Sequence, residues 1–137
     1  MHGSVEKMMS TSPAANQRSS QLGDLAHCIE ACGECAQTCI ACADACLSED
    51  QIEMLRECIR SNQDCADICA TTASVLTRIG GGRTSKRAQH LVRACAAACA
   101  ECAAECEKHA KMHEHCRICA EACRRCEGLC RAMMIGA

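Results

Sequence analysis

Eighteen of the 137 residues are cysteines, and their spacing gives the first indication of chemistry in this chain. Along four segments they recur at intervals of three, four or seven residues. These intervals place side chains on one face of an α-helix, at the a and d positions that Leu and Ile normally occupy. The four runs are Cys28, Cys32, Cys35, Cys39, Cys42 and Cys46; Cys58, Cys65 and Cys69; Cys95, Cys99, Cys102 and Cys106; and Cys116, Cys119, Cys123, Cys126 and Cys130.

A helix face lined with thiols is suited to binding soft metal ions, because thiolates select Cu(I) over harder cations. Neighbouring thiols on one helix are poorly placed for disulfides, which need Cβ atoms about 3.5–4.5 Å apart. Residues i and i+4 have Cβ atoms about 5–6 Å apart; disulfides between helices remain geometrically allowed. Two unshared thiolates per ion would give 9 ions for 18 cysteines. Because thiolates can bridge, we predict that more than 9 Cu(I) ions bind per chain.

Three alternative roles for the cysteines are less favoured. Zn²⁺ in a few tetrahedral Cys₄ sites between helices is the main alternative, and would make the protein a zinc-stabilised structural or interaction bundle. Free Cys is often a small buried hydrophobe, but packing gives no reason to prefer it to Val or Leu at 18 positions. A redox enzyme would need strands around an exposed CxxC pair, and no acid–base constellation is visible, so we predict no enzyme.

Four further residues are candidate ligands. His109 and His113 continue the cysteine intervals toward Cys116. Imidazole is a common metal ligand. Asn62 takes a position in the second run where a Cys is expected, and Met54 precedes that run at the same interval. We therefore add His109, His113, Met54 and Asn62 to the metal-binding residues.

The elements that must position these residues are four helices. The first is expected from Leu22 to Leu47, and the second from a capping box formed by Ser48 and Gln51 to about Ile79. Residues 80–82 are three glycines, which end that helix and form a link. Thr84 or Ser85 is expected to cap the third helix.

The break between the third and fourth helices is placed near Lys111 to His113. A single helix across this region would be about 75 Å long, at about 1.5 Å per residue, which is too long for so small a domain. The sequence therefore predicts an all-α fold, an up-down antiparallel four-helix bundle with a cysteine-lined core. Residues 1–20 are expected to form a flexible N-terminal arm, with a short helix near Val5 to Met9, and residues 21–137 the metal-storage domain.

In such a bundle the two ends differ in composition. The candidate ligands Met54, His109 and His113 gather at one end, which we interpret as the metal entrance. Leucines and methionines such as Leu22, Leu76 and Met133 gather at the opposite end, which we interpret as an apolar plug.

Composition limits the partners and the compartment. A net charge of −2 gives no electrostatic basis for binding nucleic acid or an anionic membrane. The apolar runs are interrupted by Glu, Gln or Asp, so no segment is expected to span a bilayer. The first 22 residues lack the apolar stretch of an export signal. We therefore predict a cytoplasmic protein, in a compartment where thiols stay reduced.

The CxxxCxxCxxxCxxCxxxC run of residues 28–46, with the related runs after it, resembles the cytosolic bacterial copper storage proteins of the Csp3 type. The resemblance covers about Leu22 to Met134. It implies a four-helix bundle that stores many Cu(I) ions on core thiolates for copper storage, buffering and detoxification. It also implies uptake at a His-containing end and a homotetramer. Copper ions are the expected partners, with a copper chaperone as their expected donor or acceptor.

Overall fold

The computed structural model describes residues 3–13, 22–79 and 85–135, and these residues form helices and no strand. The elements are α1 (Ser4–Ser10), α2 (Leu22–Leu47), the short 3₁₀ helix η2 (Ile52–Leu55), α3 (Arg56–Thr77), α4 (Lys86–Glu107) and α5 (Glu114–Ile135). Each of the four long helices has 22 or 26 residues, long enough to run the length of the molecule.

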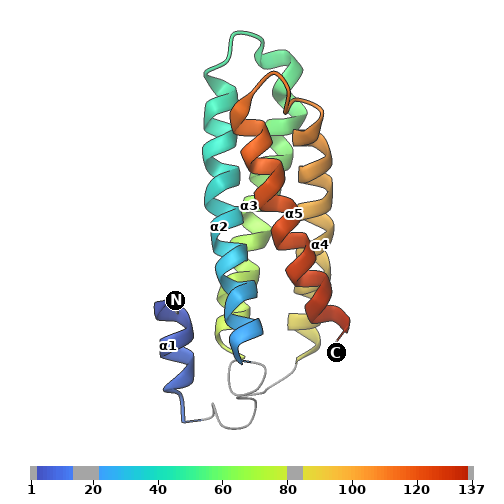
Figure 1. Ribbon diagram of the computed structural model, residues 1–137. Coiled ribbons are helices and arrows are strands. Elements are labelled where there is room, and N and C mark those ends of the chain that lie inside the picture. Colours follow the sequence, from blue (N-terminus) through green and yellow to red (C-terminus); the bar gives the residue numbers. More distant parts are fainter. Residues whose placement is uncertain (1–2, 14–21, 80–84, 136–137) are drawn as a thin grey trace.

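The long helices form an up-down antiparallel bundle (Figure 1). α2 packs against α3 and α5, and α4 packs against the same two helices, so each long helix has two neighbours. This arrangement confirms the fold class predicted from the cysteine spacing. None of the described helices is both long and apolar enough to cross a membrane.

Most helix boundaries agree with the sequence prediction. α2 begins at Leu22 and ends at Leu47, as expected. Ser85 caps α4, because its side chain accepts a hydrogen bond of 3.1 Å from the backbone N–H of Ala88. The break between α4 and α5 is present, although it begins at Lys108, slightly earlier than expected. The triple glycine at residues 80–82 and Thr84 lie outside the described residues.

The predicted capping box of Ser48 and Gln51 is wrong. The backbone N–H of Ser48 bonds to the carbonyl of Ala45, which closes the end of α2 instead of opening the next helix. Gln51 precedes η2 and α3 follows Leu55, and neither residue makes a side-chain cap. Leu55 is 1% exposed, so its burial fixes this corner more strongly than a cap does.

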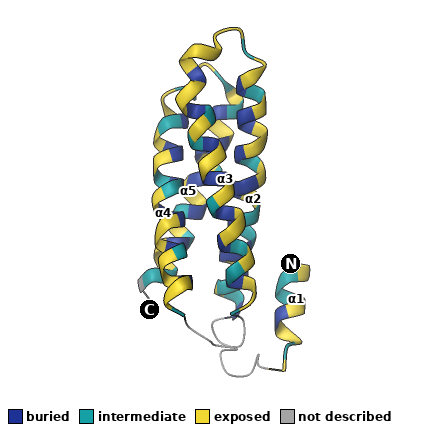
Figure 2. Ribbon diagram, turned by 180° about the vertical axis from the view of Figure 1, so that it is seen from behind, coloured by how far each residue is buried: buried dark blue, intermediate teal, exposed yellow. Residues whose placement is uncertain are grey.

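The core of the bundle is built from thiols and small residues. All 18 cysteines are buried, with Cys42 2% exposed and the others 0%. Figure 2 shows buried residues recurring along each long helix of the bundle. We call these 18 buried side chains the thiol column. Alanines pack beside them, and among the described residues the only larger side chains exposed by less than 2% are Leu55, Leu76, Asn62 and Thr72. Alanine is a strong helix former with a small side chain. It lets the helices approach closely, so the thiol groups reach the bundle axis.

The two ends of the thiol column are closed by different residues. At the end formed by the α2–α3 and α4–α5 connections, which we call the His end, lie His109, His113 and His115. At the opposite end, which we call the Leu end, Leu22, Leu76 and Val92 are buried. Met133 and Met134 also pack there against the core.

The short helix expected near Val5 is present as α1. It packs against α2 and buries Met9, which is 5% exposed. Residues 14–20 of the predicted arm lie outside the described residues, so the boundary between arm and bundle stays a prediction.

Candidate metal centre

All 18 thiols are free, and they lie close to one another across the bundle axis. The Sγ atom of Cys69 is 3.6 Å from that of Cys95 and 3.6 Å from that of Cys99. Contacts of 3.7 to 4.0 Å continue along the axis through Cys35 and Cys39. Because the contacts join all four helices, no thiol in the middle of the column depends on one helix alone for its neighbours.

The thiols fall into groups of four that share members. In each group the ligand atoms all lie within 4.8 Å of one another. Cys35, Cys39 and Cys123 each belong to more than one group. The all-thiol groups include Cys32, Cys95, Cys126 and Cys130; Cys35, Cys65, Cys69 and Cys99; Cys35, Cys39, Cys65 and Cys123; and Cys39, Cys102, Cys119 and Cys123.

These separations suit a thiolate-bound metal without rearrangement of the helices. With a metal–sulfur bond of about 2.3 Å, two thiolates lie about 4.6 Å apart in a linear site and about 4.0 Å apart in a trigonal one. In the groups of this bundle every pair of ligand atoms lies within 4.8 Å, and neighbouring sulfur atoms are 3.6 to 4.0 Å apart. Because one sulfur can serve two adjacent groups, the column can hold bridged ions.

Burial keeps two of the thiols at the His end, Cys46 and Cys116, protonated at neutral pH. Burial raises the pKa of the Cys46 thiol to about 11. Burial, together with the charge of Cys42, also raises the pKa of Cys116. A metal ion that binds here must therefore displace protons, and its binding weakens as the pH falls.

Asn62 takes the place of a thiol within the column. It is fully buried, and its Oδ1 atom accepts hydrogen bonds from Cys102 at 3.0 Å and from Cys119 at 3.2 Å. Its Nδ2 atom donates to Cys58 at 3.7 Å. The amide oxygen therefore points at thiols of α4 and α5, where it can bind a metal or stabilise a thiol.

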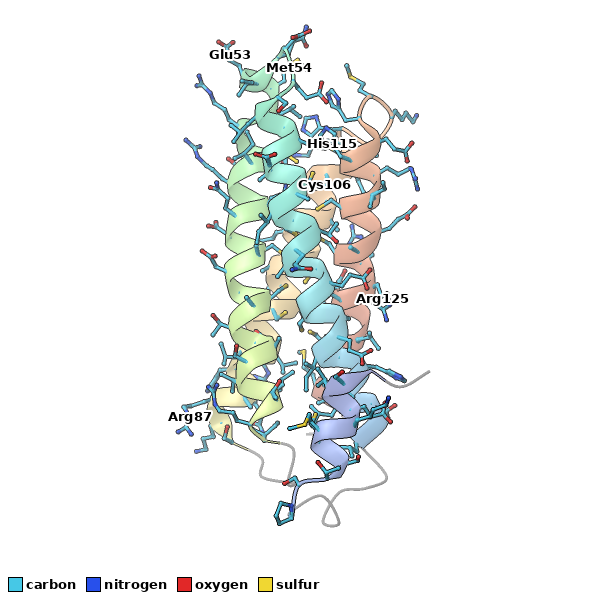
Figure 3. All side chains as sticks on the ribbon, turned by 90° about the vertical axis from the view of Figure 1, so that its left-hand side faces the viewer. Glu53, Met54, Arg87, Cys106, His115 and Arg125 are labelled. Carbon is cyan, nitrogen blue, oxygen red and sulfur yellow. The ribbon has the colours of Figure 1, made fainter. Side chains whose placement is uncertain are left out.

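His115 is the histidine that contacts thiols. Its Nδ1 atom is 3.5 Å from the Sγ atom of Cys42 and 3.6 Å from that of Cys116. With Cys42, Cys46 and Cys116 it forms a group of potential ligands at the His end. Figure 3 shows His115 near the top of the bundle. Its Nε2 atom is 3.0 Å from Glu49 Oε2. A carboxylate that accepts a hydrogen bond from Nε2–H keeps the proton on Nε2 and leaves the Nδ1 lone pair free, the usual arrangement around a metal-bound histidine.

The pKa of His115 reflects these contacts. Burial lowers it, but the hydrogen bonds to Cys42 and Glu49 and the charges of these two groups together raise it, and the pKa lies above its ordinary value. Protons therefore compete with a metal for this imidazole.

The two histidines predicted from the sequence lie at the same end but contact carboxylates. His109 Nε2 is 3.1 Å from Glu105 Oε2. His113 Nδ1 is 3.2 Å from Glu49 Oε2, and its ring stacks on that of His115 with the centroids 5.4 Å apart. Both histidines are less than a quarter exposed. His113 therefore lies beside His115, whereas His109 lies beside Glu105 of α4.

Met54 lies apart from the other candidates. It is in η2 and is 58% exposed, so it is outside the buried column (Figure 3). Exposed at the His end, a thioether can contact an arriving ion but takes no part in the core.

His115 is not among the ligands predicted from the sequence, because it lies one residue before Cys116 and falls outside the run through His113. A signal was present, since His115 is four residues before Cys119. α5 begins at Glu114, so His115 is in its first turn. Both His115 and Cys116 therefore face the axis there.

The sequence model of the copper storage protein family matches residues 21–135. The cysteine-rich protein YhjQ of Bacillus subtilis is 39% identical over 106 residues, which cover 77% of this chain and 92% of that protein.

Solved structures give the same result. The copper storage protein Ccsp of Streptomyces lividans, loaded with 10 copper equivalents, is 47% identical, with a TM-score of 0.91 over 98% of this chain and 100% of that one. The Cu(I)-bound copper storage protein BsCsp3 is 38% identical, with a TM-score of 0.70 over 79% of this chain and 95% of that one. The protein described here therefore belongs to the copper storage protein family.

Proposed function

We propose that this protein stores Cu(I) in the cytosol and binds more than 9 ions per chain through its 18 core thiolates. The observation that carries the proposal is the overlap of the four-thiol groups: Cys35, Cys39 and Cys123 each belong to more than one group. A thiolate shared between groups can bridge two ions, so capacity is not limited to two thiols per ion. Storage at this capacity would also buffer and detoxify copper.

The overlap of the four-thiol groups also favours copper storage over the zinc-stabilised alternative. A structural Zn²⁺ site closes four ligands around one ion. In this column, filling one group removes ligands from the next, so only a few Zn²⁺ ions could bind at full coordination. Cu(I) accepts fewer thiolates per ion and tolerates bridging, and therefore uses the whole column.

Storage, rather than catalysis, follows from the same burial. The thiols are at most 2% exposed, so no organic or macromolecular substrate can reach them. A bare ion can reach them if ligands pass it inward. Copper is thus the cargo, and its exchange partners would be a copper chaperone or another donor and acceptor.

The non-cysteine ligands divide by position. His109, His113 and the exposed Met54 are proposed to capture copper at the His end, and His115 to pass it to Cys42 and Cys116. Asn62 is proposed to contribute its amide oxygen where the column lacks a thiol. Neither nucleic acid nor a membrane is a proposed partner, and a homotetramer is proposed from the family resemblance.

An anaerobic Cu(I) titration of the reduced protein against a competing chelator tests the proposal. We expect tight binding of clearly more than 9 ions per chain, half the number of its 18 cysteines, with thiolate-to-copper charge-transfer absorption that rises until saturation. A parallel Zn²⁺ titration is the control.

Saturation by a few Zn²⁺ ions that bind more stably than Cu(I), and on which helicity depends, would reject storage in favour of the structural zinc role. Because helicity is measured in both titrations, the two results are distinguishable.

A further inference from the structure

At two places in the thiol column, three sulfur atoms are in mutual contact. The first lies between α3 and α4. The Sγ atoms of Cys65 and Cys69 are 3.8 Å apart, and that of Cys99 is 3.8 Å from the first and 3.6 Å from the second. We call these three residues the α3/α4 trithiol. All three side chains are 0% exposed, so the three sulfur atoms form a closed triangle inside the core.

The second triangle lies between α2 and α5. The Sγ atoms of Cys35 and Cys39 are 3.9 Å apart, and that of Cys123 is 3.7 Å from each of them. We call these three residues the α2/α5 trithiol. In both triangles, two thiols four residues apart on one helix are joined by a thiol of a neighbouring helix. The two triangles share no residue, so both can be occupied at once.

Triangles of this size fit a pyramidal metalloid centre. Trivalent arsenic and antimony carry a lone pair, so their three bonds to sulfur form a pyramid. At angles of about 100° and bonds of about 2.3 Å, the length of a zinc–thiolate bond, the three sulfur atoms lie about 3.5 Å from one another. The edges of the two trithiols are 3.6 to 3.9 Å long. Small side-chain rotations would therefore close each triangle around such a centre.

The core also suits an uncharged ligand. Among the described residues, the buried polar side chains are Asn62 and Thr72, and neither is charged. Arsenous acid, As(OH)₃, is uncharged in neutral water, so it enters an apolar interior at less cost than an ion does. Three S–H and three As–OH bonds are exchanged for three As–S bonds and three water molecules. Arsenic stays trivalent, no sulfur is oxidised, and the product is again uncharged.

A hollow in the surface leads toward one of the two triangles. It has a volume of about 510 Å³ and lies between α3 and α4, and Cys65 is among the residues that line it. Ser61 and Glu101 also line it, and their oxygen atoms can accept hydrogen bonds from the hydroxyl groups of arsenous acid. Of the two trithiols, only the α3/α4 one contributes to this lining. A small solute in the hollow is therefore next to the α3/α4 trithiol.

We propose that the metal-free protein binds two trivalent arsenic atoms per chain, one on each trithiol, and that the first enters through the hollow between α3 and α4. The ligand class is the uncharged hydroxides of trivalent metalloids, with arsenous acid as the probe. This second cargo goes beyond copper storage. Because its binding is measured on protein without copper, it stands or falls separately from the proposed storage function.

An anaerobic titration of the reduced, metal-free protein with sodium arsenite tests the proposal. Native mass spectrometry should show two tight additions, each with the mass of one arsenic atom less three hydrogen atoms. An addition that keeps a hydroxyl group on arsenic would mean that only two thiols bind, and would overturn the trithiol assignment. The absence of tight addition would overturn it as well.

Single substitutions locate the two sites. Cys65→Ser and Cys123→Ser should each leave one arsenic bound and weaken the other at least about 100-fold, because one of three linked ligands is lost. The double variant should bind neither tightly. Cys28→Ser is the matched control, since Cys28 is equally buried but lies at the Leu end beside Cys130. If it lost arsenic as Cys65→Ser does, the proposal would be overturned. Circular dichroism confirms that each variant is folded.

A bulky side chain in the hollow tests the entry route. Ala98 lines the hollow, so Ala98→Phe should slow the first arsenic addition severalfold and leave the rate of copper uptake unchanged. Ala97→Phe, at an exposed alanine on the same helix, is the control and should load at the wild-type rate. An unchanged rate for Ala98→Phe would overturn entry through the hollow.

Copper competes for the same thiols, which gives a further test. Protein filled with Cu(I) should bind no arsenic, because all members of both trithiols are then ligands of copper. Equal arsenic binding by the metal-free and the copper-filled protein would place the arsenic outside the thiol column and overturn the proposal.

Discussion

The His end and the Leu end close the same thiol column with different chemistry. At the His end, three histidines and the carboxylates of Glu49 and Glu105 surround the last thiols. At the Leu end, Cys28 and Cys130 are 3.9 Å apart, and Leu22, Leu76 and Val92 are buried around the axis. One end offers an ion a series of exchangeable ligands; the other offers hydrocarbon.

This difference gives the column a direction. Polar ligands at a boundary with water can replace the hydration of an arriving ion step by step, whereas burying a charge in hydrocarbon is costly. We therefore expect copper to enter and leave at the His end, and the Leu end to contribute stability.

Copper loading should have the largest effect on stability, because the bound ions link all four helices along the whole thiol column. We expect filling of the column to raise the melting temperature of the reduced protein by at least about 10 °C, since ligand binding to the folded state adds stability. Calorimetry of the metal-free and loaded protein measures the shift. Removal of copper with a strong chelator should return the melting temperature to its original value.

Leu76→Ala should lower the stability of the protein without affecting copper uptake. Leu76 is 1% exposed, and truncation of a buried leucine costs about 2–5 kcal/mol through lost burial and the cavity that remains. Chemical denaturation of the metal-free protein should show this loss, while the rate of copper uptake stays unchanged. Leu47→Ala, at a leucine that is 52% exposed near the His end, is the matched control for stability. Slower uptake by Leu76→Ala would mean that copper also enters at the Leu end.

Glu49→Gln should weaken copper capture at the His end and leave the rest of the thiol column unaffected. Glu49 orients His115 through a 3.0 Å contact, and loss of such an outer partner typically weakens metal binding about 10–100-fold. We expect the first Cu(I) ions to load more slowly and less tightly, in stopped-flow and competition measurements, with total capacity almost unchanged. Asp44→Asn, at an exposed carboxylate on α2, is the control. A reduced total capacity with a normal uptake rate would contradict a role in capture.

His115→Ala is a second test of copper capture at the His end. It removes the imidazole that contacts Cys42 and Cys116, so the site at the His end should weaken by a similar factor. His90→Ala, at an exposed histidine on α4, should have no effect. Equal effects of the two variants would show that surface histidines in general, and not this site, govern uptake.

Alkaline pH should have the smallest effect, and only on the metal-free protein. Burial raises the pKa of Cys46 from 9.0 to about 11. Below pH 9 the thiol is protonated in both states; between pH 9 and about 11 the unfolded chain releases the proton first, so stability falls as the pH rises. A melting temperature lower by several degrees at the upper pH should be seen for the reduced protein. In the loaded protein the thiolates are already deprotonated, so a similar loss there would argue against thiolate ligation.

Much of this molecule can be predicted from the positions of its cysteines. The intervals of three and four residues fix a helix and its buried face together, which is why the run from Cys28 to Cys46 predicted both the limits of α2 and its side of the column. The Ser85 cap was also predictable, because its hydrogen bond spans only three residues. Ser48 shows where local patterns fail: burial of Leu55 outweighed a possible cap.

The sequence by itself determined an all-helical chain with one thiol-bearing face per long helix, because helix periodicity is a local property. Only the tertiary structure decided which thiols become neighbours, and that His115 rather than His109 or His113 contacts them. It also brought Glu57 of α3 and Glu105 of α4 to the lining of one hollow. These features depend on the rotation and alignment of packed helices, which the intervals within any single helix do not specify.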